Sequence, residues 1–98
     1  MNLPIAFRAE ATSEFRDAVA WYEGQRRGLG IEFVDEVERA LNDIAEQPDR
    51  HAVVVGDVRE SLVRRFPFCI YYRVRRGILV VLAVFHTSRD PQVWRSRV

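Results

Sequence analysis

Two residues near the end of the chain have side chains suited to acid–base and phosphate chemistry. His86 lies three residues before Arg89, and histidine is the side chain whose ordinary pKa suits proton transfer at neutral pH. Arg89, Arg95 and Arg73 could hold a phosphate beside it, because the guanidinium fork matches a phosphate in charge and geometry. The competing interpretation is structural, with His86 as a hydrogen-bonding residue at the end of a strand.

Arginines are concentrated in the second half of the chain. The formal net charge is only +1, yet residues 1–58 carry six Arg against twelve acidic residues, and residues 59–98 carry nine Arg against two. Every cation is Arg, a residue that suits polyanions and acidic protein segments. The alternative is that these arginines bind no partner and form a solvent-exposed face of the sheet, where their charge balances that of the acidic helices. The candidates for binding a phosphate or a macromolecular target are Arg64, Arg65, Arg75 and Arg95. We expect a cluster on the strands of the second half, formed by Arg64, Arg65, Arg73, Arg75 and Arg76.

Length and composition exclude several classes of protein. With 98 residues, 48% of them hydrophobic and 30% charged, the chain can bury one core without disulfides. The longest apolar run, residues 78–85, is too short to cross a membrane, and the N-terminus lacks the pattern of a secretory signal. Cys69 is the only cysteine, and no cofactor-binding motif or metal-ligand cluster is present. We therefore expect one cytoplasmic domain spanning residues 1–98, without cofactor or metal.

Apolar residues at helical spacing predict two helices that must position these groups. The first covers about residues 10–25, with Phe15 and Tyr22 on its apolar stripe, and the second continues to Gln47, where Pro48 stops it. Residues 26–30 form the break between them. Because so short a connection forces neighbouring helices to lie antiparallel, the two helices should form a hairpin.

The rest of the chain has the period of β-strands. Residues 3–8 predict a short edge strand that could pair at either edge of the sheet, and residues 51–55 are either a strand or a loop. A three-stranded antiparallel meander follows, formed by residues 58–65, 68–75 and 78–87. Residues 78–85 do not alternate, so this strand should be central and covered on both faces. The helical hairpin covers one face, and the C-terminal tail with Trp94, a partner chain or a second copy must cover the other. The predicted fold is α+β, in two layers.

The order and spacing of short segments along nearly the whole chain resemble the RelE/ParE superfamily of toxins from bacterial type II toxin–antitoxin modules. The matching segments are residues 18–23 (AVAWYE), 28–33 (GLGIEF), 44–48 (IAEQP), 58–59 (VR), 63–68 (VRRFPF), 70–74 (IYYRV) and 86–91 (HTSRDP), with Trp94. The resemblance implies the two-layer fold described above and a cognate antitoxin that inhibits the toxin by wrapping it. We expect the antitoxin to contact the Arg cluster and the apolar strand, at Ile78, Val80, Leu82 and Arg73.

The family resemblance leaves the cellular target open, because RelE-like members cut mRNA on the ribosome and ParE-like members poison DNA gyrase. In an endoribonuclease, His86, Arg89 and Arg73 would be the catalytic residues. Many ribosome-dependent relatives carry a phosphate-binding Arg where this chain has Cys69, and they often carry lysines, which this chain lacks. These departures favour ParE-like action on gyrase. The alternatives are a ribosome-dependent endoribonuclease and a non-toxic module that keeps only the antitoxin interface.

Overall fold

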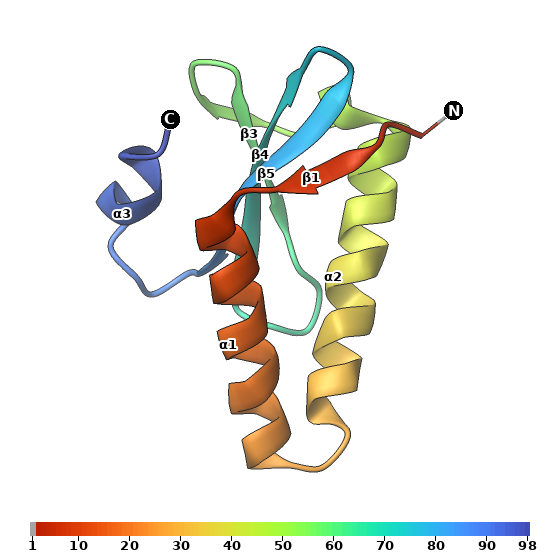
Figure 1. The fold of residues 1–98 in the computed structure, drawn as a ribbon, viewed down its shortest axis with the longest axis vertical. Helices are drawn as coiled ribbons and strands as arrows, with labels where there is room; N and C mark the ends of the chain where they lie inside the picture. The colour runs from red at the N-terminus through yellow and green to blue at the C-terminus, as the bar shows by residue number, and fades with distance from the viewer. Residues whose placement is uncertain (1) are drawn as a thin grey trace.

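Two helices lie against one face of a five-stranded sheet in the computed structural model, which describes residues 2–98 (Figure 1). The predicted α+β fold is confirmed, with an N-terminal strand, a helical hairpin and an antiparallel meander in one sheet. The elements are β1 (Ile5–Phe7), α1 (Ala9–Gln25), α2 (Leu29–Glu46), the short 3-10 helix η1 (Pro48–Arg50), β2 (Val53–Val55), β3 (Val58–Leu62), β4 (Phe68–Arg75), β5 (Ile78–His86) and α3 (Gln92–Arg95).

The sheet has the order β1-β5-β4-β3-β2, which settles two points that the sequence left open. β1 pairs in parallel with residues 79–81 of β5, so the N-terminal strand lies at the β5 edge. β2 is a strand and pairs with β3, so the antiparallel part of the sheet has one strand more than the predicted three. Both edge strands are only three residues long, and each leaves part of its neighbour unpaired.

The helical hairpin is tighter than predicted, because Leu29 and Gly30 are already the first residues of α2. Gly28 turns the chain with a left-handed φ of 89°, a conformation that glycine adopts without strain. The Glu23 carboxylate of α1 then accepts hydrogen bonds from the N–H groups of Gly28 and Gly30, each at 3.0 Å. These bonds satisfy donors that the first turn of a helix leaves without partners.

Gly30 of α2 lies against the backbone of α1. A Cβ atom there would lie 2.9 Å from the Val19 carbonyl oxygen, whereas a Cβ at Gly24 of α1 would meet nothing within 4 Å. We expect Gly30→Ala to lower the free energy of unfolding by about 1–3 kcal/mol, because backbone must shift. Gly24→Ala should raise it by about 0.5–1 kcal/mol through helix propensity. Urea denaturation of both variants tests the contact, and equal effects would contradict it.

Both faces of the central strand β5 are covered, as its apolar sequence predicts. Val81 and Val84 pack with Phe33 of α2 in the core beneath the helices. On the other face Leu82 and Trp94 belong to a second buried cluster, which α3 closes from the side away from the helical hairpin (Figure 1). Across the part of the chain that the structure describes, no helix combines the length and apolar character needed to span a membrane.

Candidate functional site

His86 opens onto a groove of about 540 Å³ between α1 and the adjoining ends of β4 and β5. The apolar residues of the groove include Ala18, Phe68 and Val84, and at its rim lies Trp21, whose side chain is 61% exposed. Trp21 packs edge-on against the ring of Tyr22, with the ring centroids 5.1 Å apart. An exposed tryptophan on an apolar groove is typical of a surface that binds another macromolecule. The full lining is Glu14, Asp17, Ala18, Trp21, Tyr22, Pro67, Phe68, Val84, His86 and Arg89.

The imidazole of His86 is already engaged within the chain. Its Nδ1 atom accepts a hydrogen bond from the Ser88 N–H at 3.0 Å, and the Ser88 hydroxyl lies 2.8 Å from the same atom. Because the backbone N–H can only donate, Nδ1 carries the lone pair and Nε2 carries the proton of the neutral ring. The basic nitrogen is therefore occupied by Ser88, which disfavours His86 as a general base.

Glu14 of α1 binds two arginines of the C-terminal segment, Arg89 and Arg97. Its carboxylate accepts hydrogen bonds from Arg89 at 2.8 Å, from Arg97 at 2.9 and 3.0 Å, and from the Val84 N–H at 3.1 Å. Arg97 also donates to the Leu82 carbonyl at 3.1 Å. Together, Glu14 and Arg97 close the edge of β5 beyond the short β1 strand. The charge of Arg89 is thus balanced inside the chain, and its guanidinium lies 4.3 Å from the centre of the Phe85 ring.

The three predicted catalytic residues do not come together. His86 and Arg89 share the groove, but Arg73 lies toward the opposite end of β4, five residues or about 17 Å along the strand from Phe68, the cross-strand partner of His86. There Arg73 donates to the Asp57 carboxylate at 3.0 Å. Arg75 and Arg73 hold the pKa of Asp57 down to about 2 by hydrogen bonding and charge, with Arg75 the larger cause.

The predicted arginine cluster is divided between the two ends of β4, which is a correction to the sequence interpretation. Arg64 and Arg65 lie in the connection between β3 and β4, where Arg65 forms an ion pair of 2.7 Å with Glu32 of α2. Arg75 lies at the other end of the strand beside Arg76, and Arg95 lies on α3. The length of β4 separates the first two from Arg75, which lies seven residues, or about 24 Å, along the strand from Phe68.

Cys69 is 2% exposed and lies in the sheet with its Sγ atom 3.8 Å from the Glu60 carboxylate. Burial is the main cause that raises the pKa of the thiol to about 11, so it stays protonated at neutral pH and is a poor nucleophile. Phe68, which precedes it, packs its ring 5.2 Å from that of His86. Because successive side chains of a strand point to opposite faces, Cys69 and His86 lie on opposite faces of the sheet.

The residues predicted to contact an antitoxin differ in accessibility. Ile78 is exposed and Val80 is half-buried, but Leu82 is completely buried in the cluster with Trp94. Leu82 is therefore wrong as a surface residue while α3 is in place. Arg73 is largely covered and paired with Asp57.

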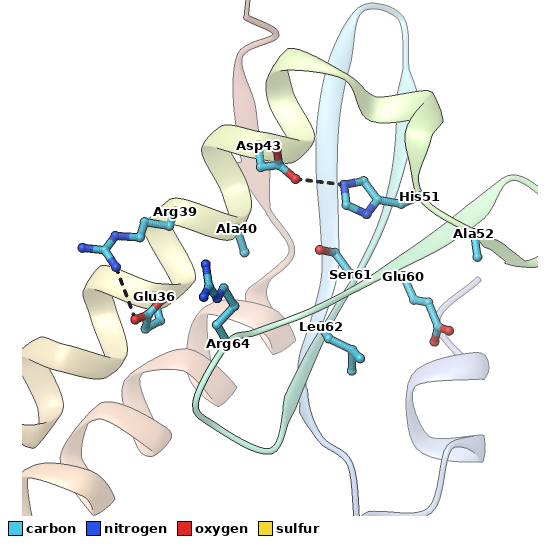
Figure 2. Close-up of a pocket in the computed structure, with 10 residues that line it drawn as sticks. All are labelled: Glu36, Arg39, Ala40, Asp43, His51, Ala52, Glu60, Ser61, Leu62 and Arg64. Carbon is cyan, nitrogen blue, oxygen red and sulfur yellow. Dashed lines mark hydrogen bonds and ion pairs between the residues drawn. The ribbon is translucent and has the colours of Figure 1, made fainter.

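A second hollow, of about 610 Å³, lies between α2 and β3 and was not predicted (Figure 2). Asp43 of α2 points across it to His51, whose Nε2 lies 3.4 Å from a carboxylate oxygen, and Asp43 also pairs with Arg50. The lining is Glu36, Arg39, Ala40, Asp43, His51, Ala52, Glu60, Ser61, Leu62 and Arg64. Within residues 2–98, no group of three or more His, Cys, Asp or Glu side chains could hold a metal ion.

Comparison with known proteins places this geometry in a family. The family model described as the ParE toxin of the type II toxin–antitoxin system parDE matches residues 5–91. A solved structure described as the chromosomal ParDE TA system from P. aeruginosa has a chain that superposes with a TM-score of 0.71, at 16% sequence identity. The superposition covers 88% of this chain and 97% of that one. At this identity the likeness demonstrates a shared fold. No curated protein sequence matches.

Proposed function

The chain belongs to the ParE toxin family of type II toxin–antitoxin systems, and on that premise we propose that it inhibits growth by binding DNA gyrase. We propose further that a cognate antitoxin neutralises it. In this mechanism the toxin binds its target protein and catalyses no reaction of its own.

The charge of the His86 groove is the observation that carries this proposal. Glu14 and Asp17 both line the groove, and the Arg89 guanidinium is balanced by the Glu14 carboxylate at 2.8 Å. The groove therefore has no excess of positive charge that would attract an RNA backbone. Proteins draw most of their affinity for that backbone from Lys and Arg side chains that are free to contact phosphates. An exposed Trp21 over an apolar floor suits a protein partner.

Three further features also favour a gyrase-binding toxin over an endoribonuclease. Cleavage of RNA at its own 2′-hydroxyl requires a base with a free lone pair and cations near the phosphate. The lone pair of His86 accepts the Ser88 N–H, Arg73 lies at the far end of β4, and the neutral Cys69 stands where many ribosome-dependent relatives carry an Arg.

Two purified reactions test the proposal directly. One follows DNA supercoiling by gyrase, and the other follows mRNA integrity during translation by ribosomes in the absence of gyrase, each with the chain added. We expect supercoiling to be inhibited and the mRNA to stay intact. Cleavage that requires ribosomes would overturn the proposal in favour of an endoribonuclease. If neither reaction responded, the chain would be a non-toxic module.

We expect His86→Ala to keep most of the growth inhibition, because no proton transfer is involved and the substitution removes only one side chain of the groove's wall. Trp21→Ala is the matched variant from the same groove. Its indole is 61% exposed, so its loss should leave folding unchanged but weaken binding of the target by about 30-fold, as expected for an interface hot spot. Induced expression in a sensitive strain, with protein levels measured, gives both results. Loss of toxicity in His86→Ala alone would contradict the proposal.

A further inference from the structure

Arg65 has a left-handed backbone conformation that no two-residue hairpin turn requires. Within residues 2–98, the non-glycine residues with a positive φ are Arg65, at 72°, and Arg76, at 53°. Arg76 and Gly77 form the two-residue turn between β4 and β5, a type of turn in which both φ angles are positive. Arg65 lies in the longer connection between β3 and β4, residues 63–67. Because a residue with a Cβ atom is strained in this conformation, contacts around Arg65 must stabilise it.

Two carboxylates of α2 provide those contacts. The Arg65 guanidinium donates a hydrogen bond to Glu32 at 2.7 Å and lies 3.8 Å from a carboxylate oxygen of Glu36. The two acids are four residues apart, so they lie on the same side of α2. Arg26 also pairs with Glu32, at 2.8 Å, and Arg39 pairs with Glu36, at 3.4 Å. The hydrogen bond from Arg65 is the largest cause that lowers the pKa of Glu32. We call Arg65, Glu32 and Glu36 the Arg65 clamp.

The two residues after Arg65 connect the clamp to the His86 groove. The Phe66 ring packs edge-on against the ring of Tyr22, with the centroids 4.8 Å apart, and the Arg65 guanidinium lies 5.5 Å from the centre of the Phe66 ring. Pro67 lines the groove. The backbone conformation of Arg65 therefore determines where the chain places a wall of the groove.

Pro67 also holds the segment that follows β5. Its carbonyl accepts a hydrogen bond from the Thr87 N–H at 2.9 Å. Thr87 lies between His86 and Arg89, which both line the groove. One backbone hydrogen bond thus joins the connection at residues 63–67 to the segment that carries these two side chains. Direct contacts lead from α2 through Arg65 and Pro67 to both walls of the groove.

We propose that Arg65 is a positioning residue, which holds residues 63–67 in the conformation that presents Pro67 and the segment after β5 to gyrase. Arg65 acts through Pro67 and does not touch the target itself. This inference rests on the proposed function, because gyrase is the partner that the groove would bind. A wall that is already ordered spares the complex the entropic cost of ordering it on binding. The Arg65 side chain is 54% exposed, and exposed ion pairs contribute little to folding. Loss of the clamp should therefore weaken binding without unfolding the domain.

The test compares inhibition of DNA supercoiling by variants from both sides of the clamp. Arg65→Gly removes the side chain and adopts a left-handed φ without strain, and Glu32→Ala removes the main acceptor. For each, about five- to tenfold more protein should be needed to halve gyrase activity. The midpoint of urea denaturation should move by less than about 0.5 M.

Two further variants provide the controls. Arg65→Lys keeps a positive charge opposite Glu32 and should restore inhibition to within about twofold of the unsubstituted chain. Arg64→Ala changes the exposed neighbour, which lies outside the clamp, and should also stay within about twofold.

A double variant distinguishes positioning from direct contact with gyrase. If Arg65 acts through the clamp, Arg65→Gly combined with Glu32→Ala should lose no more inhibition than the weaker single variant, because both changes remove the same interaction. If Glu32→Ala inhibited gyrase fully while Arg65→Gly did not, Arg65 would contact gyrase directly and this inference would be overturned.

Hydrogen–deuterium exchange tests the coupling in the chain alone. The Thr87 amide should exchange at least about fivefold faster in Arg65→Gly and in Glu32→Ala, while the amide of Ile70 in β4 should be unchanged. An unchanged Thr87 amide would overturn the inference, and Glu32→Ala decides if Arg65→Gly fails to fold. Equal inhibition by the unsubstituted chain and both variants would overturn this inference alone. No inhibition by the unsubstituted chain would overturn the proposed function.

Discussion

Replacing Trp94 with alanine is expected to lower the free energy of unfolding by about 3–5 kcal/mol. The indole is 1% exposed and stacks on Tyr71, with ring centroids 3.9 Å apart and planes inclined by only 15°. It also packs in the cluster that covers the second face of β5. Because small domains are stable by only about 5–15 kcal/mol, the variant should unfold at a much lower urea concentration, measured by circular dichroism.

The neighbouring residue provides the control for this loss. Val93 lies on the same short helix but is exposed, so Val93→Ala should cost less than about 0.5 kcal/mol. Trp94→Phe should retain most of the stability, because within residues 2–98 the buried indole N–H has no hydrogen-bond partner to lose. Equal, small losses for Trp94→Ala and Val93→Ala would mean that the cluster contributes little to folding.

The sequence predicts those parts of the fold in which burial is periodic. Tyr22 and Phe15, on the stripe predicted for the first helix, belong to the core or pack against it, because helical spacing places them on one face. The apolar run at residues 78–85 predicted a strand that is covered on both faces. That requirement made Trp94 a candidate for covering the face away from the helices. β2 remained ambiguous because its three valines do not alternate, and a short apolar run without alternation is compatible with several structures.

The candidate site could be predicted only in part, because its contacts join residues far apart in the chain. His86 and Arg89 are close in sequence, and the structure places them in one groove. The cross-strand register puts Arg73 near the opposite end of β4, and register depends on the turns and on the whole sheet. The ion pair between Glu14 and Arg97 spans 83 residues, and no local spacing rule predicts it.

Replacing Glu14 with alanine is expected to cost about 3 kcal/mol of stability. The carboxylate accepts hydrogen bonds from Arg89, Arg97 and the Val84 N–H, and the side chains of Glu14 and Arg97 are each only 12% exposed. Removing the acceptor leaves a largely buried guanidinium without its counter-ion and an edge N–H without a partner, and both are costly. Urea denaturation measures the loss, and exchange of the Val84 amide should become faster.

Asp17 is the matched control, because it lies one turn along α1 and lines the same groove. Within residues 2–98 its carboxylate has no ion pair, so Asp17→Ala should change stability by less than about 0.5 kcal/mol. Glu14→Gln keeps an acceptor but not the charge, and its loss should lie between the two. Glu14→Ala also releases Arg89 and adds one positive charge to the groove, so its affinity for RNA should rise. If stability were unchanged in Glu14→Ala, the C-terminal segment would not be anchored through this carboxylate. The ion pair between Glu14 and Arg89 would then not explain the balanced charge of the groove.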